Sequence, residues 1–186
     1  MNIFPFKRRL RKKAVADLLY EDVFHPLVDR TSELLHERLF GEALLDNPSI
    51  KIRFQLECFS LMAFLVTFSF QREFEYLGQE TNNFILDCFH SKLFENISGT
   101  FKDNTFPERL KTRYAEYYPT MKEDLRYLNL KIEDTILFRG VTGSFFNKVA
   151  PDKLKSVEIL FFNLFLAELY SLICETYDKI KKYKIS

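Results

Sequence analysis

Two pairs of side chains have the spacing that places a carboxylate and an imidazole on one face of a helix. Glu33 and His36 form the first pair, and Asp87 and His90 form the second, three residues apart in both cases. Pairs of this kind hold the metal ions of di-iron helical bundles when neighbouring helices add further glutamates. A carboxylate–histidine metal enzyme is therefore one alternative for this chain.

Other catalytic chemistry has little support in the sequence. The chain contains no glycine-rich phosphate loop, no nucleophile elbow and no zinc-protease motif. Its three cysteines, Cys58, Cys88 and Cys174, are widely spaced without a CxxC pair, which argues against a zinc site or a disulfide framework. We interpret them as buried free thiols in a reducing compartment, and we expect a protein that is not an enzyme and carries no cofactor.

A basic run near the N-terminus is the clearest charge pattern. The run KRRLRKK at residues 7–13 carries six positive charges, contributed by Lys7, Arg8, Arg9, Arg11, Lys12 and Lys13. Helical apolar spacing follows, so these cations fall on a helix N-terminus, where they oppose the helix dipole. An anionic membrane would offset this, because each nearby Lys or Arg contributes roughly 1 kcal/mol at a lipid surface. We predict that the six residues contact an anionic membrane surface.

The remaining charges argue against a nucleic-acid partner. The chain has a net charge of +1, so the residues outside the basic run sum to −5 (+1 minus +6). No compact helix-turn-helix follows the basic run, as it would in a repressor. The C-terminus is basic again, at Lys179, Lys181, Lys182 and Lys184.

One apolar stretch, residues 54–70, organises the elements that must position these side chains. It contains no charge from Cys58 to Phe70, which is too apolar for a surface helix and shorter than the roughly 18 residues that span a bilayer. A second apolar run covers residues 159–167. We expect two buried helices that pack on each other. Glu57 is expected at a helix edge or beside a nearby cation such as Arg53.

The fold class follows from length and composition. A chain of 186 residues suits one domain, and only five glycines disfavour an all-β fold with its many tight turns. We predict an all-α, single-domain bundle of about six or seven helices around two very apolar helices. Residues 1–13 form the basic N-terminal segment and residues 14–186 the helical domain. Helix boundaries are expected at His25-Pro26 and at Pro119, because proline disrupts a helix interior.

The first residues do not have the order of a secretory signal, because their charges follow the apolar residues instead of preceding them. We therefore expect a cytoplasmic location, or a peripheral one on the inner face of a membrane.

The opening FKRRLRKKAVADLLY, residues 6–20, resembles the start of the ubiquinol–cytochrome c chaperone family. The Arg53-Phe54 pair leads into an apolar helix, as in that family, and residues 85–89 and 108–118 fall in a similar order to its helices. Residues 43–48 depart from the Gly-Val-Pro-Asp-Thr that precedes the Arg-Phe pair in the family. The resemblance implies a non-catalytic α-helical factor that assists assembly of the cytochrome bc1 complex, with newly made cytochrome b as its partner.

Together these features predict a non-enzymatic binding or assembly factor, chaperone-like, at the cytoplasmic face of a membrane. An aromatic groove would hold an apolar segment of a membrane protein, since the chain has 21 Phe and 9 Tyr. A second alternative is a helical protein that binds a lipid- or quinone-like small molecule in a Phe-lined cavity between the two apolar helices.

Overall fold

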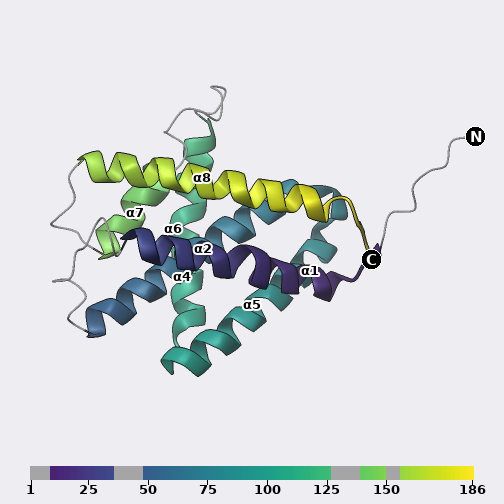
Figure 1. The fold of residues 1–186 in the computed structure, drawn as a ribbon, viewed down its shortest axis with the longest axis horizontal. Coiled ribbons are helices and arrows are strands. Elements are labelled where there is room, and N and C mark those ends of the chain that lie inside the picture. Colours follow the sequence, from purple (N-terminus) through teal and green to yellow (C-terminus); the bar gives the residue numbers. More distant parts are fainter. Residues whose placement is uncertain (1–8, 36–47, 127–138, 150–155) are drawn as a thin grey trace, which may run out of the picture.

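The structure is a computed structural model, and it describes residues 9–35, 48–126, 139–149 and 156–186 (Figure 1). These residues form an all-α fold, as predicted, with one two-stranded parallel sheet of two residues per strand. The elements are β1 (Arg9–Leu10), α1 (Lys12–Leu18), the π-helical segment η1 (Leu19–Phe24), α2 (His25–Leu35), α4 (Pro48–Glu73), the 3-10 segment η3 (Glu75–Leu77), α5 (Gln79–Phe101), α6 (Phe106–Arg126), α7 (Arg139–Val149), α8 (Ser156–Ile180) and β2 (Lys184–Ile185).

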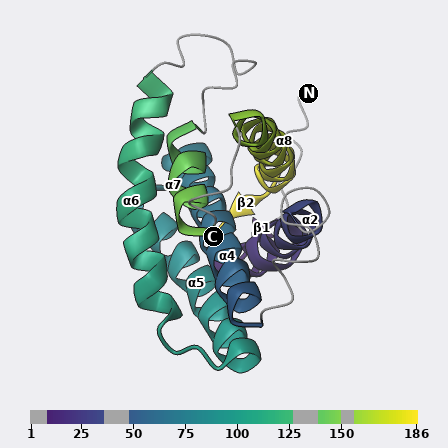
Figure 2. The same cartoon turned by 90° about the vertical axis from the view of Figure 1, so that its left-hand side faces the viewer.

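Helix α4 is the centre of the fold, which confirms the role predicted for residues 54–70. It contacts α2, α5, α6, α7 and α8, and Figure 2 shows it between α6 and α7 on one side and α2 and α8 on the other. Every residue from Ser60 to Phe70 is buried. By length and composition, Lys51–Glu73 could cross a membrane, but 72% of its most apolar window is buried inside this fold. Its apolar surface is therefore used as a protein core.

The second apolar run, residues 159–167, lies in α8. Within this run, only Leu166 and Ala167 have described side chains. Among the described residues, α4 alone is long and apolar enough to pass for a spanning helix. The expected packing of α8 on α4 is confirmed. The Tyr177 hydroxyl of α8 donates a hydrogen bond to the Val66 carbonyl of α4, 2.9 Å away, inside the core.

Both prolines expected to end helices lie within them, so those two boundaries were wrong. Residues 12–35 form one continuous helix, and the π-helical turn η1 lies immediately before His25-Pro26. A π turn is wider than an α turn, which makes room for a proline ring that would otherwise clash with the carbonyl four residues earlier. Helix α6 continues through Pro119 to Arg126. There the Thr120 hydroxyl donates to the carbonyl of Tyr117 at 2.9 Å, within the same turn.

Candidate functional site

The two ends of the described chain are joined. Strands β1 and β2 pair in parallel, with Arg9 beside Lys184 and Leu10 beside Ile185. The Ser186 N–H donates to the Leu10 carbonyl at 3.0 Å, and the Lys12 N–H donates to the Ser186 carbonyl at 3.3 Å. Residues 9–13 of the basic segment are thereby part of the fold and lie against the C-terminus (Figure 1).

This pairing brings two basic stretches into one place. Residues 9–13 and 182–186 together contain six basic residues and no acidic one. All are exposed except Lys12, which is half-buried. We call this set the terminal basic surface: Arg9, Arg11, Lys12, Lys13, Lys182 and Lys184.

The helix that begins here gives the surface additional positive potential. Arg11 is the N-cap of α1 and makes no side-chain cap hydrogen bond, and the first turn contains no acidic residue. Unpaired N–H groups at a helix N-terminus carry partial positive charge. The Ser186 carbonyl satisfies the Lys12 N–H, which offsets part of this charge from within the chain.

Exposed aromatic side chains border the terminal basic surface. Among the described residues, the large apolar side chains that are exposed are Ile52, Tyr76 and Phe84. The Lys12 ammonium lies 5.8 Å from the centre of the Phe84 ring, and that ring is 49% exposed. Tyr76, 65% exposed, lines a pocket of about 490 Å³ together with Lys184 of the terminal basic surface. Two of these three exposed side chains, Tyr76 and Phe84, therefore lie beside lysines of the terminal basic surface.

The sequence-predicted contact residues divide between described and undescribed parts of the chain. Arg9, Arg11, Lys12 and Lys13 lie on the terminal basic surface. Lys7 and Arg8 lie outside the described residues. The predicted residues that the structure describes therefore lie in one segment, which the strand pairing holds beside the stretch with Lys182 and Lys184.

The four residues of the metal alternative are not seen together in the structure. Glu33 is in α2, but its side chain and all of His36 lie outside the described residues. Asp87 is exposed on α5, whereas His90 is half-buried and bonds to Thr67 and Tyr114. Within the described residues, no group of three or more His, Cys, Asp or Glu side chains could hold a metal ion. The cysteines are free, with Cys58 buried and the other two half-buried.

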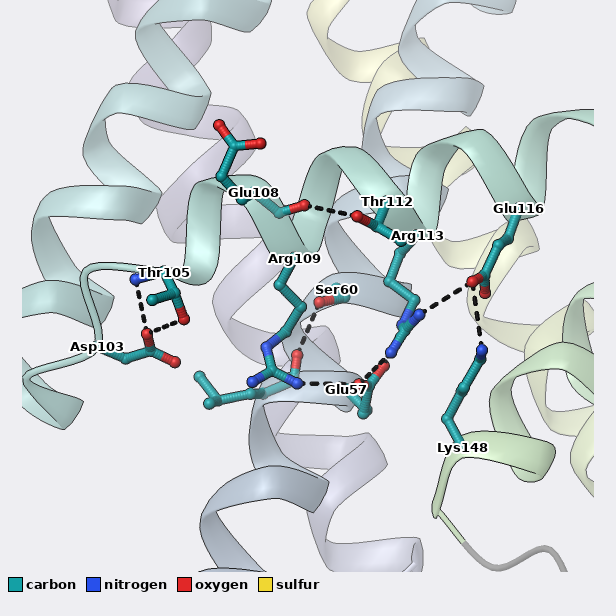
Figure 3. A network of polar contacts seen from close by, with 11 residues as sticks. Glu57, Ser60, Asp103, Thr105, Glu108, Arg109, Thr112, Arg113, Glu116 and Lys148 are labelled. Atoms are coloured by element: carbon teal, nitrogen blue, oxygen red, sulfur yellow. Dashed lines mark hydrogen bonds and ion pairs between the residues drawn. The ribbon is translucent and has the colours of Figure 1, made fainter.

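A buried ion-pair network joins α4, α6 and α7 (Figure 3). Glu57, fully buried in α4, accepts two hydrogen bonds from Arg113, at 2.6 Å from Nε and 2.7 Å from Nη2, and one from Arg109 at 3.2 Å. Arg113 also donates to Glu116 at 3.1 Å, and Lys148 of α7 lies 3.3 Å from the same Glu116 oxygen.

This network corrects the expectation for Glu57. Its cations are Arg109 and Arg113 of α6, which follow it by 52 and 56 residues in the chain. Arg53, the cation expected from the sequence, is exposed. Burial alone would raise the pKa of Glu57, but the hydrogen bonds and charges of Arg113 and Arg109 outweigh it and hold the pKa below its usual value. Both carboxylate oxygens accept hydrogen bonds from α6, so the group links α4 to α6 inside the core.

The signal for the complete terminal basic surface was present in the C-terminal lysines, but their pairing with the N-terminus was not predicted. No sequence pattern near Thr67 predicted its contact with His90, and none near Arg109 and Arg113 predicted their ion pairs with Glu57. The chain matches no protein-family model, no curated protein and no solved structure.

Proposed function

We propose that the chain is a non-enzymatic binding factor that docks on an anionic membrane surface through the terminal basic surface. The observation that carries this proposal is the joining of two basic chain ends by strand pairing. The resemblance to the chaperone family supports an apolar segment of a membrane protein as the partner, cytochrome b in that family, and assembly as the task. The cytoplasmic face of the membrane is the proposed location.

The electrostatics of the pairing support an anionic partner. Neighbouring strands lie roughly 4.8 Å apart, so the backbones of Arg9 and Lys184 are held within that spacing with no acidic residue in either stretch. Like charges side by side on paired strands are unfavourable. Lipid phosphates would neutralise several of these cations together, since the spacing is well within the screening length of about 8 Å at physiological salt.

The bordering aromatic residues support a lipid surface over a dissolved polyanion. Aromatic rings are favoured at the headgroup level of a bilayer, where an apolar ring and a polar tip are both accommodated. Tyr76 and Phe84 are exposed beside the cations in that arrangement.

Vesicle binding tests the proposal. The variant Lys182→Gln/Lys184→Gln should bind phosphatidylserine-containing vesicles about 30-fold more weakly than the wild type, since each Lys contributes roughly 1 kcal/mol near an anionic surface. Replacing all six N-terminal basic residues with Gln should abolish salt-sensitive flotation without lowering the thermal stability. These residues are Lys7, Arg8, Arg9, Arg11, Lys12 and Lys13.

The matched control removes the same charge from the far end of the molecule. Lys51 and Arg53 are exposed near the start of α4, which lies opposite the C-terminus in Figure 1. Lys51→Gln/Arg53→Gln should leave vesicle binding within about twofold, because α4 begins at the side of the molecule opposite the C-terminus (Figure 1) and salt screens exposed charges that are far from the membrane. Equal losses in the two double variants, or none in either, would contradict docking through the terminal basic surface.

A further inference from the structure

A pocket of about 470 Å³ lies between α5 and α6, and nothing in the proposed function uses it. Each helix contributes residues spaced three, four and seven apart, which is one helical face. The lining residues are Asp87, His90, Ser91 and Phe94 from α5, and Pro107, Leu110, Lys111 and Tyr114 from α6. Its volume is within the range of pockets that hold small molecules.

Three polar atoms form a closed triangle at this pocket. The Tyr114 hydroxyl lies 2.9 Å from Nε2 of His90 and 2.9 Å from Oγ1 of Thr67, and Nε2 of His90 lies 3.2 Å from Oγ1 of Thr67. Thr67 is buried in the central helix α4, so the third atom of the triangle comes from a different helix than the pocket lining.

Counting protons assigns the tautomer of His90. The triangle contains two hydroxyl protons, and both can be donated within it only if Nε2 is an unprotonated acceptor. Tyr114 makes the shorter contact to Nε2, 2.9 Å against 3.2 Å for Thr67, so Tyr114 donates to Nε2 and Thr67 donates to the Tyr114 oxygen. A proton on Nε2 would leave only the Thr67–Tyr114 contact for two hydroxyl protons, so one of the two hydroxyls would have no acceptor among the hydrogen bonds of the described residues. The proton of the neutral ring is therefore on Nδ1.

The environment of His90 agrees with a neutral ring. Burial lowers its pKa from 6.5 to about 4, and the Asp87 carboxylate opposes this shift without cancelling it. Nδ1–H has no hydrogen-bond partner among the described residues, although His90 lines the pocket. Nδ1 is also not among the buried atoms without a partner, so this donor is accessible to a partner outside the described chain.

The rest of the lining restricts what can accept that hydrogen bond. Phe94, Pro107 and Leu110 provide apolar surface, and the rings of His90 and Phe94 are nearly parallel, at 16° with 6.0 Å between their centres. Flat aromatic ligands stack favourably on such a surface. One carboxylate, Asp87, and one ammonium, Lys111, leave the lining without net formal charge.

We propose that the α5–α6 pocket binds an uncharged, planar aromatic carbonyl compound whose carbonyl oxygen accepts a hydrogen bond from Nδ1–H of His90. The apolar residues contact its rings. A neutral ligand needs no counter-charge, which agrees with the balanced lining, and a carbonyl oxygen supplies the missing acceptor. This site is independent of the terminal basic surface and does not rest on the proposed function.

Two probes of the same shape isolate the hydrogen bond. 9-Fluorenone has a ring carbonyl, and fluorene has a methylene group in its place. Equilibrium dialysis with the full chain should show fluorenone binding about tenfold more tightly than fluorene, as expected for one directed hydrogen bond in a partly desolvated site. The infrared carbonyl band of bound fluorenone should move to lower frequency. No binding of fluorenone, equal binding of the two probes, or an unshifted carbonyl band would each overturn the proposal.

A variant locates the donor. His90→Phe keeps an aromatic ring beside Phe94 and removes Nδ1, so the preference for fluorenone should fall to about one while fluorene still binds. His25→Phe is the matched control, because His25 is exposed and pairs with Asp29 outside the pocket, and it should retain the tenfold preference. A preference that persists in His90→Phe would overturn the assignment to His90. The carbonyl shift is measured on the wild type, so the proposal stays testable even if the variant does not fold.

Discussion

Replacing His90 with Phe should remove a large part of the pH dependence of stability. In the folded chain His90 has a pKa of about 4, because burial disfavours the charged ring, whereas the ordinary value is 6.5. The unfolded chain therefore takes up the proton first as the pH falls. The stabilisation that His90 provides is complete above the ordinary pKa and is lost progressively as the pH falls towards the folded pKa.

The difference of 2.5 pKa units (6.5 minus about 4) corresponds to about 3 kcal/mol when the pH reaches the folded pKa. Between pH 7 and pH 5 the same two pKa values give a loss of about 2 kcal/mol in the free energy of unfolding. Glu57 contributes little to the change in unfolding free energy between pH 7 and pH 5, because its pKa is held below its usual 4.5 and it stays ionised in the folded chain.

Urea unfolding of the wild type and His90→Phe at pH 7 and pH 5 measures the effect. The wild type should lose about 2 kcal/mol more than the variant over this interval, whatever the stability of the variant at pH 7. His25→Phe removes an exposed histidine and should retain the wild-type dependence. Parallel pH dependences for the wild type and His90→Phe would refute the argument that His90 is buried in its neutral form.

Two further substitutions test the buried polar groups of the core. Glu57→Ala removes the buried carboxylate that accepts two hydrogen bonds from Arg113, whose side chain is 11% exposed, and should cost about 3 kcal/mol in urea unfolding. A loss below about 1 kcal/mol would show that the network is solvated. Tyr177→Phe removes the donor to the Val66 carbonyl and an acceptor of the Ser69 hydroxyl. It should cost about 1 to 2 kcal/mol by the same measurement. Tyr76→Phe, at an exposed ring, is the control and should cost nothing. Equal effects of the two tyrosine substitutions would contradict the structure.

The central helix was predictable because the signal for burial is local. A run without charge from Cys58 to Phe70 has no solvent-facing side, so its helix must be covered on all sides, as α4 is. The partners of Glu57 were not predictable from spacing. Arg109 and Arg113 belong to a charged helix that, in sequence, has the composition of a solvated one, and only the packing of α6 on α4 turns these two residues inward.

The prolines show how packing overrides a local rule. The residue before proline is biased away from the helical region, which is why His25-Pro26 predicted a boundary. Buried residues continue on both sides of Pro26, with Val23 and Phe24 before it and Leu27 and Val28 after it. Keeping all four in the core requires a helix that passes through the proline, and the π turn η1 accommodates the ring at a smaller cost than exposing those side chains.

The charges of the terminal basic surface were predictable from the sequence, but the pairing that joins its two stretches was not. The six N-terminal cations and the C-terminal lysines are both visible as charge patterns, but strands of two residues have no periodicity that predicts their partner. Their register depends on where α1 and α8 end, which is decided by the packing of the whole bundle. Leu10 and Ile185 are half-buried against the core, and this apolar contact holds together two segments whose charges repel each other.

His90 marks the limit of arguments from spacing. Three residues separate it from Asp87, so the two share a helix face, but sharing a face does not determine which residue points towards the core. Asp87 remains exposed at the rim, while His90 reaches Thr67 and Tyr114, which are 23 and 24 residues away in the chain. Because Nε2 accepts the Tyr114 hydroxyl proton, the proton of the neutral ring is on Nδ1 and can be donated. The chemistry of this histidine is therefore that of a neutral donor, and its partner has to be an acceptor.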